Sequence, residues 1–536
     1  MYNGTDMSVF KPKPLNNRYK IIIYFTILAI NLAYIIYRIF ATLPLTLRPI
    51  DIFFAVIVLA IEIVESLEFL VYFINNLVYK KKSPKIPKVN PDKLKDVDIF
   101  IATINEDDRL LSKTLKACKN LEYPKKIHVY LCDDGERDHL RKLAAKYGAT
   151  YLGLKSHYSA KAGNYNHALK HSDSPYVAFF DADMCPKKDF LLKTMPFFAK
   201  YQKVGFVQTP QSFRNPDFFQ SRFSKQMPCE QDYFYKHIQL ARNNINSTIL
   251  CGTNCVVSRQ ALKEVGGFSQ TTVAEDIATG MLIESKGYRG IAINKTLARG
   301  EAVNNYADFL KQRSRWGRGC IQTQKAYNIL KLKGLNLRQK ADYLVAINYW
   351  HFGLRRFAFM ALPLLFVFFN IIAIEADMKI FLPLFLANYF LKRFVIDFFE
   401  KNHRSATWNT IYEIIQMPYL AIAILKELFY TNRKFIVTPK STKISKKISK
   451  VDYLMLFIHF ALLLICGTGA ALASYKSQLK NFYIYIIPLV WITINLCYEL
   501  VAVIFSVRSS TEDNFNPKSK KKYGIKSFLS IIWRKQ

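Results

Sequence analysis

Cysteine, glycine and proline are scarce in this chain of 536 residues, which contains 9 Cys, 20 Gly and 20 Pro. So little Gly and Pro beside a hydrophobic content of 51% excludes collagen-like and intrinsically disordered chains. The Cys residues are odd in number and form no Cys-x-x-Cys pair, so we interpret them as reduced thiols rather than as the framework of a small secreted domain. The length predicts more than one structural unit.

Acidic residues are few as well, since 40 Asp and Glu face 76 Lys and Arg and leave a formal net charge of +36. Such a surplus is typical of proteins that bind polyanions. Here, however, the Lys and Arg residues border long apolar segments, and no basic region of a known nucleic-acid-binding module is present. We therefore expect a lipid bilayer, and no nucleic acid, as the partner of this charge.

Six apolar runs approach the length of about 20 residues that a helix needs to cross the hydrocarbon core of a bilayer. They are residues 21–40, 52–74, 357–374, 380–399, 453–474 and 482–506. The first run lacks the small-residue cleavage site of a signal peptide, so we expect it to remain in the chain. A further run, 411–430, contains Pro418 and carries Glu413, Lys426 and Glu427 near its ends, so we expect it to lie along the membrane interface.

The orientation follows from short flanks rich in Lys and Arg, which remain in the cytosol. Such flanks precede the first run, follow the second and form the tail after the last. We therefore expect a multi-pass protein of the inner (plasma) membrane, with both termini and the central domain in the cytosol. The second run carries Glu62, Glu65 and Glu68 on one helical face, which are either functional groups inside the membrane or part of a face that packs on other helices or lies near the aqueous edge.

In the middle of the chain, short β-branched or aromatic runs alternate with helical patterns, which predicts an α/β fold with a parallel sheet covered by helices. The predicted strands are residues 97–104, 127–132, 150–154, 176–180 and 205–208. The predicted helices between them are residues 110–120, 140–147 and 162–170, where apolar residues recur at spacings of three and four. These connections are long enough for right-handed crossovers.

Acidic side chains follow three of the predicted strands. Glu106 follows the first strand, Asp133 the second, and Asp181 and Asp183 the fourth. Ligands of such sheets collect at the carboxyl ends of the strands, where several carboxylates repel one another unless a cation lies among them. Asp-x-Asp also occurs by chance in acidic turns, but its position directly after an apolar strand favours a site for Mg²⁺ or Mn²⁺ that bridges a diphosphate.

Seven short motifs follow one another along this region. They are Asp133-Asp134-Gly135, Lys161-Ala162-Gly163-Asn164, Asp181-Ala182-Asp183, Gln208-Thr209-Pro210, Cys251-Gly252-Thr253, Glu275-Asp276 and Gln312-Arg313-Ser314-Arg315-Trp316. In order and spacing they resemble the family 2 glycosyltransferases of the GT-A fold and, among these, the bacterial cellulose synthases. An eighth motif, Phe435-Ile436-Val437-Thr438-Pro439-Lys440, is similar to the FxVTxK gating loop that lies between membrane segments in that family.

The resemblance implies a donor site for UDP-glucose and a divalent metal, Mg²⁺ or Mn²⁺. The implied ligands are Thr103, Glu106 and Asp133 for the uridine, and Asp181 and Asp183 for the metal. Departure of a diphosphate is assisted by a divalent ion and by cationic donors. Lys161, at the start of a predicted helix, is such a donor for phosphate, and a solvated surface lysine is the alternative.

On the acceptor side, a carboxylate must remove the proton of the attacking sugar hydroxyl, and we predict Asp276 as this general base. The family motif is Thr-Glu-Asp, whereas Ala274 stands here in place of the Thr, so we expect the local hydrogen bonding to differ. A helix N-cap is the alternative role of Asp276. Trp316 offers a flat apolar face for the terminal sugar of the acceptor, with a buried structural Trp as the alternative.

Three further residues complete the predicted site. Gln312 and Arg315 lie three residues apart on a predicted helix, so both would present polar groups to the phosphates of donor or product. Cys251 occupies the position that the family places close to the acceptor, although free Cys is commonly part of a core.

The predicted gating segment, residues 433–450, carries seven Lys and Arg residues and no acid. Such a stretch favours the binding of phosphate. The resemblance implies that it closes over the diphosphate when donor is present and excludes water. The implied contacts are Phe435, Val437, Thr438 and Lys440. Binding of the same lysines to the membrane surface is a competing and compatible explanation.

Together these features predict a processive, inverting glycosyltransferase that polymerises glucose from UDP-glucose into a β-glucan, β-1,4-linked as in cellulose, and secretes it through its own channel. A hydroxyl-rich polymer cannot dissolve in hydrocarbon, which explains the membrane helices. The partners implied are the growing β-glucan and accessory secretion subunits. A mixed-linkage β-glucan synthase, a chitin- or hyaluronan-like synthase that uses UDP-N-acetylglucosamine, and a nucleotide-sugar-binding transporter or receptor remain alternatives.

The predicted parts of the chain are a transmembrane hairpin (1–82), a cytosolic GT-A domain (83–325), interfacial and transmembrane helices (326–430), a gating loop (431–450), a second transmembrane hairpin (451–507) and a basic cytosolic tail (508–536). Only 30 residues follow Ser506. Since a PilZ barrel needs more, we do not expect the regulatory PilZ domain that many bacterial cellulose synthases carry.

Overall fold

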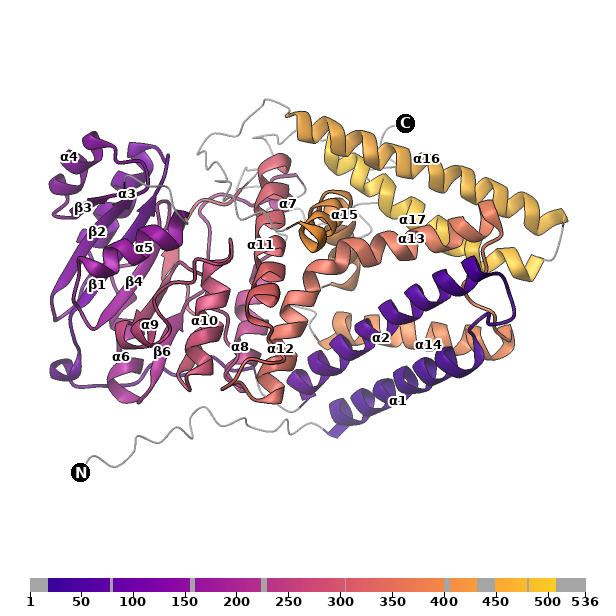
Figure 1. Cartoon of the computed structure of the whole chain (residues 1–536), viewed down its shortest axis with the longest axis horizontal. Coiled ribbons are helices and arrows are strands. Elements are labelled where there is room, and N and C mark those ends of the chain that lie inside the picture. The colour runs from indigo at the N-terminus through magenta and orange to yellow at the C-terminus, as the bar shows by residue number, and fades with distance from the viewer. Residues whose placement is uncertain are drawn as a thin grey trace, which may run out of the picture.

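The computed structural model describes residues 18–77, 81–154, 160–222, 229–303, 305–399, 405–430, 449–479 and 482–507. An α/β part lies at the left of Figure 1 and a group of long helices at the right, with α11 (Tyr306–Tyr327) and α12 (Leu337–Asn348) between them. The predicted gating residues Phe435, Val437, Thr438 and Lys440 lie outside the described residues.

The α/β part contains a seven-stranded sheet of order β3-β2-β1-β4-β7-β6-β8. The strands are β1 (Val97–Thr103), β2 (Ile127–Asp133), β3 (Thr150–Gly153), β4 (Tyr176–Asp181), β6 (Val204–Gln208), β7 (Cys255–Ser258) and β8 (Arg289–Ala292). All five predicted strands are confirmed, and so are the three predicted helices, which are α3 (Asp108–Lys119), α4 (Asp138–Lys146) and α5 (Ala160–Lys170).

The sheet is mixed and not purely parallel, which corrects the prediction from the sequence. Strand β7 runs antiparallel to both of its neighbours, β4 and β6, whereas the other described pairs of this sheet are parallel. All four residues of β7 are buried, so the strand shows no polar alternation by which its sequence could be recognised.

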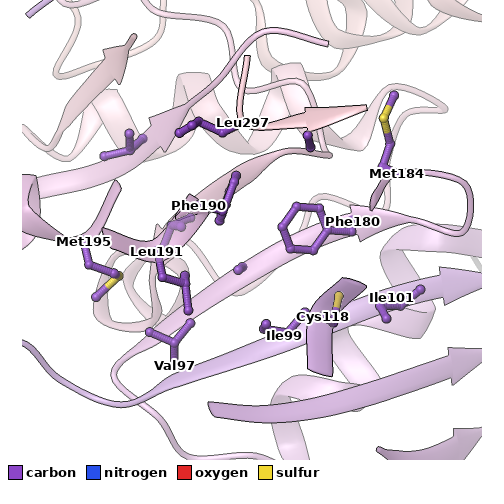
Figure 2. Close-up of a cluster of buried hydrophobic side chains, with 14 of the residues drawn as sticks. Val97, Ile99, Ile101, Cys118, Phe180, Met184, Phe190, Leu191, Met195 and Leu297 are labelled. Atoms are coloured by element: carbon purple, nitrogen blue, oxygen red, sulfur yellow. The ribbon is translucent and has the colours of Figure 1, made fainter. Parts of the chain in front are cut away.

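Both faces of the sheet are buried in apolar cores. Alternate side chains of β1 point to opposite faces and so enter different cores. Val97, Ile99 and Ile101 enter one apolar core, where Phe180 of β4 and Phe190 of α6 (Phe190–Lys200) also pack (Figure 2). The intervening residue Phe100 enters a second core with Tyr165 of α5 and Phe179 of β4. Helices on both faces therefore leave only the ends of the strands for a binding site.

Four described segments are long and apolar enough to cross a membrane: α1 (Arg18–Ala41), the run Leu337–Phe369, α16 (Lys450–Leu479) and Ile484–Ser506. The second of them joins α12 to α13 (Phe352–Phe369), and the last lies within α17 (Phe482–Val507). Two more runs predicted to cross form the long helices α2 (Pro49–Leu77) and α14 (Met378–Phe399), which carry more charge. Their crossing, and hence the count of six, stays a prediction.

The predicted interfacial segment forms α15 (Ala406–Phe429). Figure 1 shows α15 almost end-on, whereas α16 and α17 run in the plane of view. Helix α15 packs closely on α13 and α11, so it joins the membrane helices to the α/β part.

A buried ion pair ties the first strand to the helix that follows β7. The guanidinium of Arg259, in α9 (Arg259–Glu264), donates to Asp98 Oδ2 of β1 at 2.6 Å, and both side chains are almost fully buried. Ser174 donates to the same carboxylate through its hydroxyl at 2.6 Å and its backbone amide at 3.0 Å. The carboxylate is therefore well supplied with donors as long as Arg259 is present.

Replacing Arg259 by Met should lower the stability of the protein by about 3 to 5 kcal/mol, because it removes the buried cation beside Asp98. The remaining side-chain partners of this carboxylate would be Ser174 and the more exposed His128. The measurement is thermal unfolding of the detergent-solubilised protein. Lys263→Met on the exposed side of the same helix is the matched control and should change the stability by no more than about 0.5 kcal/mol. Equal melting temperatures of the two variants would contradict this role of the pair.

Candidate active site

The order of the strands brings the acidic residues of the sequence to one edge. Strand β1 lies between β2 and β4, and these three parallel strands end at Thr103, Asp133 and Asp181. Glu106 follows β1 directly. The residues predicted to bind the nucleotide sugar are therefore neighbours at the carboxyl end of the sheet, where open α/β sheets bind their ligands.

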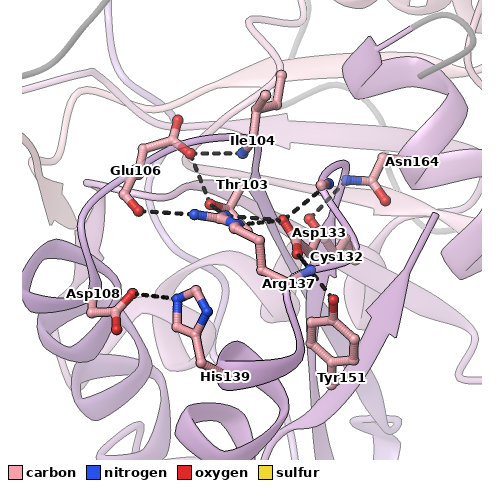
Figure 3. A network of polar contacts seen from close by, with 11 residues as sticks. Thr103, Ile104, Glu106, Asp108, Cys132, Asp133, Arg137, His139, Tyr151 and Asn164 are labelled. Carbon is pink, nitrogen blue, oxygen red and sulfur yellow. Dashed lines mark hydrogen bonds and ion pairs between the residues drawn. The ribbon is translucent and has the colours of Figure 1, made fainter. Parts of the chain in front are cut away.

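Thr103, Glu106 and Asp133 belong to one hydrogen-bond network, which Figure 3 shows. Glu106 Oε2 accepts from the Thr103 hydroxyl at 2.8 Å, and Arg137 Nη2 donates to Thr103 Oγ1 at 2.8 Å and to Asp133 Oδ1 at 2.9 Å. Tyr151 donates its hydroxyl to Asp133 Oδ2 at 3.0 Å. Sequence reasoning missed Arg137 and Tyr151, because Asp133 ends a strand and Arg137 precedes a helix, so no helical spacing relates the two.

The three residues differ in their access to the cavity beside the sheet. Thr103 and Glu106 line that cavity, whereas Asp133 is fully buried beneath Arg137. Asp133 therefore orients its neighbours in this structure, and its predicted contact with a nucleoside stays a prediction.

Asp181 and Asp183 also face different surroundings. Asp181 lines the cavity, and its Oδ1 accepts from Lys161 Nζ at 2.7 Å. Asp183 is buried, and its Oδ2 accepts from the backbone amide of Glu301 at 2.9 Å. Among the described residues no cluster of three or more His, Cys, Asp and Glu side chains could hold a metal ion by itself. The carboxylate of Asp181, which faces the cavity, nevertheless fits a hard divalent cation that takes most of its other ligands from phosphate and water.

Lys161 is part of the site and not a solvated surface lysine. Its ammonium donates to Asp181 and, at 2.8 Å, to the carbonyl oxygen of Gly252. Burial disfavours the charged form of Lys161, but Asp181, Tyr165 and Glu275 together outweigh this effect, so the pKa of the lysine is raised. Its predicted contact with phosphate is not tested by these coordinates, which contain no ligand.

Gly252 lies between Lys161 and the predicted base. Its φ of +64° is a conformation that favours glycine. A Cβ atom at this position would lie 3.0 Å from Asp276 Oδ2 and 3.2 Å from Lys161 Nζ. The absence of a side chain at residue 252 thus allows the carboxylate and the ammonium to approach each other.

Asp276 is the second residue of α10 (Glu275–Ser285), and its Oδ1 accepts from the amide of Ile277 at 2.8 Å. The N-cap position belongs to Ala274, which offers no side-chain hydrogen bond, so the alternative role of Asp276 as the N-cap is wrong. Burial raises the pKa of Asp276, against the opposing charges of Lys161 and Arg315. Burial, together with the neighbouring charge of Asp276, raises the pKa of Glu275 to about 7.

Helix α11 supplies the other side of the site. Gln312, Arg315 and Trp316 all line the cavity, as their helical spacing predicts. The guanidinium of Arg313 lies 4.3 Å from the ring centroid of Trp316, and Trp350 meets the same ring edge-on at 6.4 Å. These two contacts, which sequence reasoning missed, fix the plane of Trp316.

One cavity of about 1550 Å³ joins these groups and continues among the membrane helices. Of the predicted site residues, it is lined by Thr103, Glu106, Lys161, Asp181, Cys251, Asp276, Gln312, Arg315 and Trp316. Aromatic side chains line its continuation, among them Tyr34, Phe385, Tyr389, Trp408, Trp491 and Tyr498. The cavity therefore extends from the sheet edge to the long helices, where aromatic rings and polar groups line it.

The three glutamates of α2 also line this cavity, and each of them is paired with an arginine. Glu65 Oε1 lies 3.8 Å from Arg355 Nε. Glu62 accepts from Tyr34 and from Arg38, both at 2.7 Å, and Glu68 accepts from Arg355 at 2.8 Å. They therefore pack on neighbouring helices and at the same time face a polar interior. The two interpretations of these glutamates are compatible.

Comparison with known proteins shows which proteins the α/β part of this chain resembles. Residues 176–396 match the family model described as glycosyl transferase family group 2. The mannosyltransferase PcManGT from Pyrobaculum calidifontis, solved in complex with GDP-Man and Mn²⁺, gives a TM-score of 0.51 at 21% identity, with 71% of this chain and 100% of that chain covered. That likeness shows the fold, so the α/β part of this chain is a GT-A-like domain.

The chain is also similar in sequence to cellulose synthases. The cellulose synthase catalytic subunit (UDP-forming) of Pseudomonas fluorescens strain SBW25 is 30% identical over 426 residues, which are 78% of this chain and 57% of the relative. The cellulose synthase 1 catalytic subunit (UDP-forming) of Komagataeibacter xylinus is 29% identical over 489 residues, which are 89% of this chain and 64% of the relative. The chain thus spans less than two thirds of either relative, and it is similar to them over most of its own length.

Gly252→Ala should lower the rate of sugar transfer at least about ten-fold, because the added methyl group presses on Asp276 and Lys161. The positive φ should also cost about 1 to 2 kcal/mol of stability. Turnover and melting temperature are measured on the same preparations. Gly266→Ala is the matched control, since Gly266 has a φ of +81° but no atom within 4 Å of the added Cβ. Similar turnover of both variants would show that backbone strain alone, and not contact with the site, causes the effect.

Proposed function

We propose that this protein is a processive, inverting glycosyltransferase that extends a β-1,4-linked glucan from UDP-glucose. The observation that carries the proposal is the single cavity that joins Asp181, Asp276 and Trp316 and continues between the membrane helices. Support for the donor comes from the relatives, whose names describe UDP-forming cellulose synthases.

In the proposed reaction, the nucleoside binds beside Thr103 and Glu106, at the carboxyl end of β1. Lys161 and Arg315 supply positive charge where the diphosphate departs. A divalent ion, Mg²⁺ or Mn²⁺, held by Asp181 and Asp183 would neutralise charge on that diphosphate. The structural relative PcManGT was solved with Mn²⁺ and a nucleotide sugar.

On the acceptor side, the terminal sugar packs on the face of Trp316, and its hydroxyl donates to Asp276. Asp276 accepts the proton as the new glycosidic bond forms, so the sugar is transferred in a single displacement with inversion. A carboxyl with a raised pKa is a stronger base than an ordinary one, which suits this task at neutral pH.

The product leaves through the continuation of the cavity. Charged groups inside a membrane protein face its interior or a water-filled space and commonly mark the path of a substrate. Glu65, Arg356 and Lys392 line this part of the cavity beside the aromatic rings. We propose an inner-membrane location with six spans, a cytosolic catalytic domain and cytosolic termini, and accessory secretion subunits on the far side.

Membranes containing the protein, supplied separately with labelled UDP-glucose and UDP-N-acetylglucosamine and a divalent ion, should form polymer only from UDP-glucose. A β-1,4-glucanase should degrade that polymer, and Asp276→Asn should reduce its formation by about 10²-fold or more. Polymer formed from UDP-N-acetylglucosamine would contradict UDP-glucose as the donor and support a chitin- or hyaluronan-like synthase. Unchanged turnover of Asp276→Asn would contradict the assignment of Asp276 as the base.

The pH dependence follows from the carboxyl groups of Glu275 and Asp276. Since only the deprotonated form of Asp276 accepts a proton and burial raises its pKa, kcat/KM should begin to fall between about pH 8 and 5, before an ordinary carboxyl titrates. Glu275, whose pKa is raised to about 7, gains its proton in the same range. The measurement is kcat/KM for UDP-glucose across this range, with the melting temperature recorded at each pH. A plateau that extends down to about pH 5, where an ordinary carboxyl begins to titrate, would contradict the raised pKa.

A further inference from the structure

The segment that carries Asp276 is held by two helices that are distant in the sequence. The backbone amide of Val273 donates to Gln322 Oε1 of α11 at 2.9 Å. Gln322 Nε2 in turn donates to Glu427 Oε1, near the end of α15, at 3.0 Å. Gln322 and Glu427 are each only 1% exposed, so water does not compete for these hydrogen bonds.

A second contact holds the same segment against α11. Gly319 packs so closely on Ala274 that a Cβ atom at residue 319 would overlap the side chain and backbone of Ala274. Ala274 is the N-cap residue of α10 and supplies no capping side chain. Where the N-cap residue cannot anchor the first turn of a helix itself, neighbouring groups must do so.

The carboxylate of Glu427 determines the orientation of the side-chain amide of Gln322. An ionised carboxylate only accepts hydrogen bonds, so the NH₂ group of Gln322 faces Glu427 and its carbonyl oxygen faces Val273. Glu427 is itself fixed, since Arg318 Nε donates to Glu427 Oε2 at 2.9 Å and Lys325 Nζ donates to the backbone carbonyl of Glu427 at 2.5 Å. A reversed Gln322 would present NH₂ to the Val273 amide, and both groups would be donors.

We propose that Glu427 and Gln322 are positioning residues that hold the segment from Val273 to Asp276, and therefore the base, at a fixed place relative to Trp316. The proposal rests on the function of Asp276 proposed above. Trp316 and Gln322 lie on the same helix, so the surface that seats the acceptor and the anchor of the base share one rigid element. Loss of the anchor would displace Asp276 without removing any group that binds donor.

The test uses a pair of nearly isosteric substitutions in the full-length membrane protein. Gln322→Glu places two carboxylates against each other, and Glu427→Gln no longer dictates the orientation of residue 322. In the double variant, the introduced carboxylate at residue 322 accepts one hydrogen bond from the Val273 amide and another from the introduced amide at residue 427. Both hydrogen bonds of the wild type are therefore present again, the second with donor and acceptor exchanged. Arg318→Lys is the control, since it keeps a cation beside Glu427 and leaves the Gln322 bond in place.

Each single substitution should lower kcat on the order of ten-fold while KM for UDP-glucose stays within about two-fold, because the base is misplaced and the donor site is intact. The double variant should recover most of the lost kcat, and Arg318→Lys should resemble the wild type. A role in stability alone predicts lower melting temperatures with unchanged kcat of the folded fraction. That result, or a double variant as slow as the singles, would overturn the proposal.

Hydrogen exchange separates this inference from the proposed function. The amide of Val273 should exchange faster in each single variant than in the wild type, and slowly again in the double variant. This readout does not depend on the identity of the donor sugar. If the wild type formed no polymer from UDP-glucose while exchange followed this pattern, the proposed function would be wrong and the positioning role of Gln322 and Glu427 would be supported. Unchanged exchange in Gln322→Glu would contradict that positioning role.

Discussion

The site depends on the balance between carboxylates that share a buried cavity and the cations placed among them. Asp181, Glu275 and Asp276 would repel one another in such surroundings. Lys161 bonds directly to Asp181, and the charges of Lys161 and Arg315 oppose the rise in the pKa of Asp276. This balance leaves Asp276 more basic than an ordinary carboxyl and still able to ionise, which is the state that a proton acceptor near neutral pH requires.

The parts of the structure that follow from local patterns could be predicted from the sequence. The strands that end at Thr103, Asp133 and Asp181 are rich in β-branched and aromatic residues, and an acidic residue at or shortly after the end of each strand marks this edge of the sheet. The spacing of Gln312, Arg315 and Trp316 likewise indicates one face of a helix.

What the sequence could not show are contacts between segments that are distant in the chain. The bond from Tyr151 to Asp133 joins two strands, and the bonds of Gln322 to Val273 and Glu427 join residues that are 49 and 105 positions apart. No periodicity in one segment reports on such a partner. The antiparallel β7 was missed for a different reason, since four buried residues carry no alternating pattern.

A consequence for movement follows from the single helix that carries both Trp316 and the anchor of the Asp276 segment. Because Trp316 and Gln322 belong to α11, a tilt of this helix would move both residues together and would act on the segment of Asp276 through the bond to Val273. The first turn of α10 also lies beside Gly252, which contacts Lys161, the partner of Asp181. Displacement of α11 would therefore strain Asp276 between two attachments, one on α11 and one at the sheet edge.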